Sequence, residues 1–67
     1  MTIERYFTVA SKYEDKMFNI DSLINKKGGY FIKTQTKAGF VYTVDFDSQS
    51  KGDEFDLELR ELIPNLL

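Results

Sequence analysis

Seven carboxylates in the last third of the sequence are the residues whose type and spacing most suggest chemistry. They are Asp45, Asp47, Asp53, Glu54, Asp56, Glu58 and Glu61. Only Lys51 and Arg60 oppose them, so residues 45–67 have a formal charge of −5, whereas residues 1–44 have a formal charge of +3. An acidic segment on a small domain favours a surface that binds something basic or that imitates a polyanion.

Metal binding and catalysis are two common uses of carboxylates. A calcium loop of the EF-hand type that began at Asp45 would need Gly at its sixth position and Glu at its twelfth. The sequence has Ser50 and Asp56 there. It also has no cysteine. It has no histidine either, and histidine is the commonest general base and a frequent metal ligand. We therefore expect no metal, no cofactor and no catalytic residue, and we predict that the protein is not an enzyme.

A basic group of side chains suggests a second chemistry. It consists of Lys26, Lys27, Phe31, Lys33 and Lys37. Aromatic residues interleaved with lysines on a sheet are typical of proteins that hold single-stranded nucleic acid. Such sheets usually offer two or three aromatic residues rather than one, and lysines also cap helices and keep surfaces soluble. A small nucleic-acid-binding regulator is therefore the alternative hypothesis, with direct binding of nucleic acid ranked second.

The acidic segment has an ordinary structural explanation as well. Charged side chains on an edge strand discourage aggregation, which would account for Asp56 and Glu58 but not for the carboxylates before them. The chain is small and acidic, has no Cys or His, and is rich in Lys, Asn and Phe. In these respects it resembles many small phage or mobile-element proteins that bind and inhibit host enzymes. The favoured hypothesis is a bacterial or phage protein-binding module, an inhibitor or regulator. Its partner would have a basic surface, as nucleic-acid-binding enzymes do, which the module would engage by nucleic-acid mimicry.

Residues 2–18 give the clearest periodic pattern among the elements that must position these side chains. At about 100° per residue, the apolar residues fall on one side of a helical wheel: Ile3, Tyr6, Phe7, Val9, Ala10, Tyr13 and Met17. The run Tyr-Phe-Thr-Val favours a strand instead, but its apolar residues do not alternate strictly. We predict an amphipathic helix over residues 2–18 with Thr2 as its N-cap.

The next segment carries helix-ending signals. Residues 21–25 fit a short helical turn, and the lysines at 26 and 27 stand where cations suit a helix C-terminus. Gly28 and Gly29 permit the left-handed conformation that stops a helix.

Residues 30–47 predict a β-hairpin. A three-residue loop at 37–39, with glycine in the left-handed bulge position, pairs Ile32 with Val44. We expect Phe7 of the N-terminal helix to be buried against Ile32, Tyr42 and Val44. One face of the hairpin then carries mostly apolar side chains: Tyr30, Ile32, Thr34, Thr36, Phe40, Tyr42, Val44 and Phe46.

The segment after a loop at residues 48–54 fits two structures. Apolar residues at 55, 57 and 59 alternate with charged ones, as in a strand. Those at 55, 59, 62, 63 and 66 fit a helix capped by Asp53, with Leu57 in water and Pro64 interrupting it. Because a lone hairpin is marginal in water, we predict a third strand and keep the short helix as the alternative.

Together these elements predict a single α+β domain over residues 1–67, with an N-terminal amphipathic helix packed on an antiparallel hairpin or three-stranded sheet. A chain of this size buries only about 60% of its unfolded surface, so aromatic packing must stabilise it, and a homodimer is a further route. No apolar run approaches the ~20 residues of a membrane span. The N-terminus lacks the features of a signal peptide, so we expect a cytoplasmic protein without membrane contact.

Overall fold

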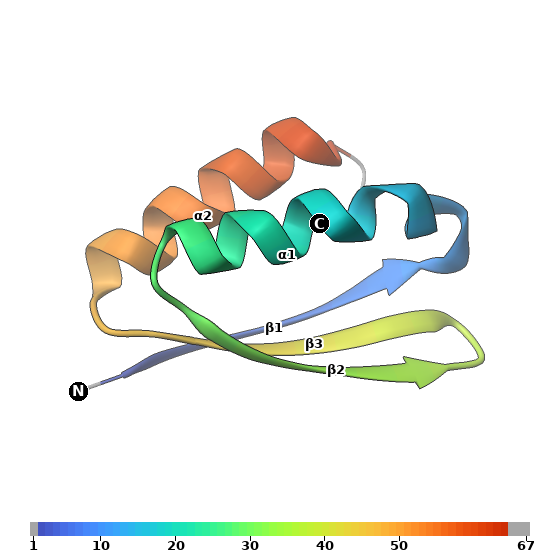
Figure 1. The fold of residues 1–67 in the computed structure, drawn as a ribbon, viewed down its shortest axis with the longest axis horizontal. Coiled ribbons are helices and arrows are strands. Elements are labelled where there is room, and N and C mark those ends of the chain that lie inside the picture. Colours follow the sequence, from blue (N-terminus) through green and yellow to red (C-terminus); the bar gives the residue numbers. More distant parts are fainter. Residues whose placement is uncertain (1, 65–67) are drawn as a thin grey trace.

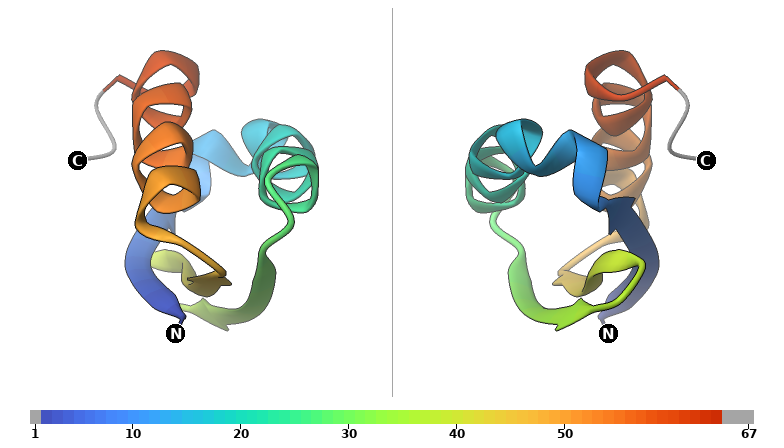
Figure 2. Two further views of the ribbon diagram at one scale, coloured as in Figure 1. Left: turned by 90° about the vertical axis from the view of Figure 1, so that its left-hand side faces the viewer. Right: turned by 90° about the vertical axis from the view of Figure 1, so that its right-hand side faces the viewer.

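Strands and helices follow one another along the chain in the computed structural model, which describes residues 2–64. The elements are β1 (Ile3–Ala10), the 3₁₀ helix η1 (Ser11–Lys16), α1 (Met17–Lys26), β2 (Tyr30–Thr36), β3 (Gly39–Phe46) and α2 (Gln49–Leu62). The strands form an antiparallel sheet in the order β1-β3-β2. Both α-helices lie on one face of this sheet, and the other face is open (Figures 1 and 2). The predicted α+β class is confirmed.

The N-terminal segment is a strand, so the helix predicted over residues 2–18 is wrong for residues 3–10. β1 runs antiparallel along the whole length of β3. Strand alternation buries Phe7 and Val9 under the helices, whereas Tyr6, which the helical pattern counted as apolar, is 68% exposed. The β-favouring run therefore prevails because it gains a long pairing partner. Helical structure begins only at Ser11.

α1 is longer than the helical turn predicted at residues 21–25. Its ten residues bury Met17, Ile20 and Ile24, the spacing of one helix face. The predicted stop is confirmed: Gly28 has φ +75°, and the N–H of Gly29 donates to the carbonyl of Ile24 at 2.9 Å.

The hairpin is confirmed, but its predicted register is wrong by one residue. The loop has two residues, 37 and 38, so Gly39 pairs with Thr36 and Ile32 pairs with Thr43. Gly39 has φ +140°, and a Cβ atom there would lie 2.1 Å from the carbonyl oxygen of Val9. Glycine is thus required by the close approach of β1 and not by a bulge in the loop.

This shift reverses the two faces of β2. Phe31 turns toward the helices and packs against Tyr42, with 5.8 Å between the ring centroids. Tyr30 and Ile32 point into solvent and are 79% and 70% exposed. The expectation that Ile32 belongs to the core is therefore wrong.

The C-terminal segment is a helix, so the predicted third strand is wrong and the helical alternative is correct in type. The helix is longer than expected, because it begins at Gln49, inside the predicted loop. α2 buries Phe55 and Leu59, the C-cap residue Ile63 is buried as well, and Leu57 is 62% exposed. The hydroxyl of Ser48, rather than the carboxylate of Asp53, accepts the capping bond, from the N–H of residue 51 at 3.4 Å. The helix ends at residue 62, two residues before the proline that was expected to interrupt it, and Leu66 lies outside the described residues.

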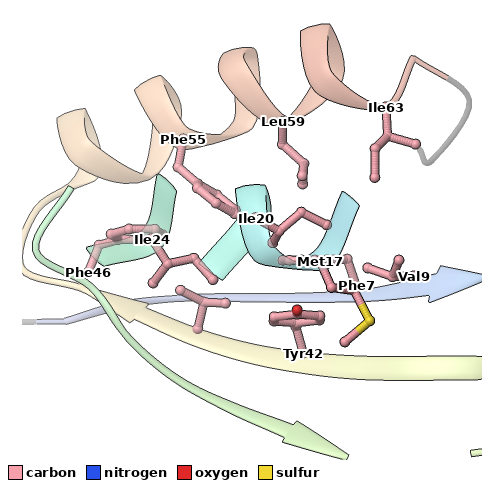
Figure 3. Packing of buried hydrophobic residues seen from close by; sticks show 11 residues of the cluster. Phe7, Val9, Met17, Ile20, Ile24, Tyr42, Phe46, Phe55, Leu59 and Ile63 are labelled. Carbon is pink, nitrogen blue, oxygen red and sulfur yellow. The ribbon is translucent and has the colours of Figure 1, made fainter. Parts of the chain in front are cut away.

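The core lies between the helices and the sheet (Figure 3). Phe7 stacks on Tyr42 with 4.9 Å between the ring centroids, and Phe55 packs against both Phe7 and Phe46. β1 provides the third strand that a lone hairpin needs. Residues 49–62 are therefore not required as a strand, and they form the helix α2, which covers the sheet. Of the expected core group, Phe7, Tyr42 and Val44 are buried together. No helix within residues 2–64 has both the length and the apolar content of a membrane span.

Candidate protein-binding site

Arg5 holds two of the seven carboxylates. It projects from β1 toward α2, where its Nε lies 2.9 Å from Asp56 and its Nη2 lies 3.4 Å from Asp53. Gly52 leaves room for the guanidinium, because a Cβ atom there would lie 3.1 Å from Nη2 of Arg5. One cation is therefore shared by two carboxylates along the side of α2 that faces β1.

Lys27 likewise contacts two carboxylates, on the side of α2 that faces α1. Its Nζ lies 2.6 Å from Glu58 and 3.7 Å from Glu54. The hydrogen bond from Lys27 lowers the pKa of Glu58, and the same bond raises the pKa of Lys27. The charge of Lys26 also acts on Glu58. α2 itself has five carboxylates against Lys51 and Arg60, a formal charge of −3.

The three remaining carboxylates lie apart from one another. Asp47 is 3.7 Å from Lys51 one helical turn later, and Asp45 sits on the open face of β3 with a buried Oδ1 that has no hydrogen-bond partner. Glu61 lies on α2 and has no basic partner within residues 2–64. The seven predicted residues thus do not form one continuous patch: five are on α2 and two are on or after β3.

A shallow groove between α1 and α2 brings two of these carboxylates together. It has a cavity volume of about 330 Å³. Leu23 and Leu62, both half-buried, supply apolar surface, and Glu58 and Glu61 supply charge. The lining residues are Asn19, Leu23, Glu58, Glu61 and Leu62.

Asn19, Leu23 and Leu62 were missed in the sequence because their role depends on two helices lying side by side. When the segment after residue 54 is interpreted as a strand, Glu58 and Glu61 fall on opposite faces of it. A helix places residues three apart on neighbouring positions. The helical alternative for the C-terminal segment would have placed Glu58 and Glu61 close together, but it did not identify α1 as the other side of the groove.

The basic group does not come together. Lys27 is engaged by α2, and Lys33 contacts Asp21 at 2.9 Å with its ammonium 5.7 Å from the centre of the Tyr42 ring. Phe31 lies on the helix side of the sheet, in contact with the core. The two remaining exposed lysines are Lys26, before β2 begins, and Lys37, after β2 ends.

Residues 2–64 contain no group of three or more Asp or Glu side chains placed to hold a metal ion. The arrangement that the described residues do offer is a groove with both leucine and glutamate side chains beside a negatively charged helix, a combination suited to recognition of a cationic, partly apolar segment. Comparison of the chain with protein-family models, with curated proteins and with solved structures finds no match.

Proposed function

We propose that the protein is a small protein-binding module that engages a basic surface of its partner through α2 and the groove between α1 and α2. The observation that carries this proposal is the pairing of Glu58 and Glu61 with Leu23 and Leu62 in one groove. Apolar contact and charge recognition then act at the same place, as they do in the core and rim of protein interfaces.

The charge of α2 supports the choice of a basic partner. α2 has five carboxylates against Lys51 and Arg60, a formal charge of −3, and Glu61 in the groove has no basic partner within residues 2–64. An excess of negative charge attracts a cationic surface, speeds association and loses strength as salt increases. A partner that uses the same basic surface for nucleic acid would be inhibited by competition, which is the regulatory role that we propose.

A labelled peptide can stand in for the basic surface of the partner and so test the proposal directly. The probe is a fluorescein-labelled amphipathic peptide of lysines and leucines, compared with a counterpart in which glutamates replace the lysines. We expect fluorescence anisotropy to detect binding of the basic peptide only. In the Glu58→Gln, Glu61→Lys double variant, this binding should weaken by at least about tenfold.

A second double variant provides the control for total charge. Glu14 and Asp15 are exposed residues of η1, outside the groove. Glu14→Lys with Asp15→Asn changes the net charge by the same amount as the groove variant and should leave binding nearly unchanged. Equal weakening in both variants, or no binding by the natural sequence, would contradict a site in this groove.

A further inference from the structure

The open face of the sheet carries an exposed apolar surface on the side of the molecule opposite to the groove. The sheet register places Tyr6, Thr43 and Ile32 in one row across the three strands. Tyr6 and Ile32 are 68% and 70% exposed, and Tyr30 in the neighbouring row is 79% exposed. Neither α1 nor α2 covers this face (Figure 2).

Charge is distributed unequally along this face. Glu4 and Asp45 pair with each other in the register at one end of the sheet. The hairpin tip with Lys37 forms the opposite end. Tyr30 lies at the acidic end, in the same row as Asp45. The side chains between the two ends are tyrosine, isoleucine, valine and threonine, with no lysine or arginine among them: Tyr6, Thr8, Ile32, Thr34, Val41 and Thr43.

We propose that this face binds the same face of a second copy of the chain, with the strands of the two copies antiparallel. A twofold axis in the plane of the contact and perpendicular to the strands places β3 on β3 of the second copy. This brings Asp45, at the acidic end, toward Lys37 of the second copy, and the contact repeats by symmetry. The row that contains Tyr6, Thr43 and Ile32 then lies near the axis in both copies. The other twofold arrangement, with the axis along the strands, brings Asp45 onto Asp45 of the second copy and is repelled.

The chemistry of the face favours a second copy over nucleic acid. A surface that holds single strands needs cations to contact the phosphates, and the nearest carboxylates, Glu4 and Asp45, repel them. The small size of the domain also favours self-association, because the described residues contain neither a disulfide nor a metal site to stabilise them.

The dimensions of the face limit the strength of this contact. Strands of eight residues are about 26 Å long, and three strands are about 14 Å wide. The projected face is smaller than the ~800 Å² per partner that stable interfaces bury. We therefore expect a reversible dimer whose population depends on protein concentration.

Sedimentation of the whole chain over a range of concentrations, up to about 1 mM, tests the proposal. We expect a monomer–dimer equilibrium that Ile32→Lys weakens by at least about tenfold. The matched control is Leu57→Lys on α2, an apolar residue of similar exposure (62%) in the opposite layer, which should leave the equilibrium unchanged. Circular dichroism of each variant establishes that it is folded.

Charge exchange tests the orientation. Lys37→Glu should weaken the dimer, and Asp45→Lys added to Lys37→Glu should restore it. The proposal is overturned if the natural chain stays monomeric throughout, if Ile32→Lys dimerises as strongly as the natural chain, or if Leu57→Lys dissociates the dimer equally. Binding of a single-stranded oligonucleotide that Ile32→Glu abolishes would also overturn it, since the face would then serve nucleic acid.

Discussion

Tyr42 joins the core to a polar cluster that links α1 to β2 and β3. Its ring is buried against Phe7, and its hydroxyl donates to Oδ1 of Asp21 at 2.6 Å. Lys33 contacts the other oxygen of the same carboxylate at 2.9 Å. Burial, and then the bond to Asp21, raise the pKa of Tyr42 well above its ordinary value of 10.0.

Removing the hydroxyl should therefore have two measurable effects. We expect Tyr42→Phe to lower the free energy of unfolding by about 1–2 kcal/mol, because Asp21 loses a hydrogen bond. Folding favours the neutral phenol, so its contribution is complete below the pKa of the unfolded chain and is lost as pH rises above about 10. In urea titrations at several pH values, the alkaline loss of stability should be smaller in Tyr42→Phe than in the natural chain.

The exposed Tyr30 supplies the control for this substitution. Tyr30→Phe should change the free energy of unfolding by less than about 0.5 kcal/mol. An equal effect of the two substitutions would show that the bond to Asp21 does not stabilise the fold. The sequence did not reveal this bond: Asp21 fits a helix start and Lys33 a solvated strand face, and only the correct hairpin register brings Lys33 beside Tyr42.

Among the elements, the pairing of the end of β1 with the start of β3 depends on one glycine. A side chain at Gly39 would collide with the carbonyl of Val9 and would hold φ at +140° against its preference. We expect Gly39→Ala to destabilise the protein by at least about 3 kcal/mol, from the steric overlap and the disfavoured backbone together. Chemical denaturation monitored by circular dichroism measures this loss.

Gly28 is the matched comparison. It also has a positive φ, +75°, but a Cβ atom there would meet only the end of the Lys51 side chain at 3.7 Å. Gly28→Ala should therefore cost only the backbone preference, about 1–2 kcal/mol. If the two variants are equally stable, contact with β1 does not explain the need for glycine at position 39.

Local signals predicted local elements well, and pairing over long distances decided the rest. The hairpin strands and the stop at Gly28 were predicted because turn residues and alternation act within a few positions. β1 and α2 were assigned wrongly because the pattern of apolar residues in each segment fits both a helix and a strand. Which period prevails depends on a partner far away in the sequence: β3 for β1, and the covered sheet for α2. The groove between α1 and α2 could not be predicted without knowing that residues 3–10 form a strand and residues 49–62 form a helix.

For the molecule as a whole, one aromatic cluster joins the sheet to α2. Phe7 touches both the sheet and α2 through its contacts with Tyr42 and Phe55. We expect Phe7→Ala to lower the free energy of unfolding by about 3–5 kcal/mol, a large part of what a domain of this size has. Thermal unfolding should show the variant largely unfolded near room temperature, whereas Thr8→Ala, on the exposed face of the same strand, should melt close to the natural chain.

The position of β3 in the middle of the sheet also affects the order in which the chain can assemble. β2 meets β3 through a two-residue loop, but Ile3 must find Phe46, 43 positions away, and Ala10 must find Gly39, 29 positions away. Loop-closure entropy grows with this separation, and contacts between distant residues slow folding. β1 therefore has no strand partner until most of the chain has been synthesised, and its docking carries the largest entropic cost of any strand pairing in the sheet.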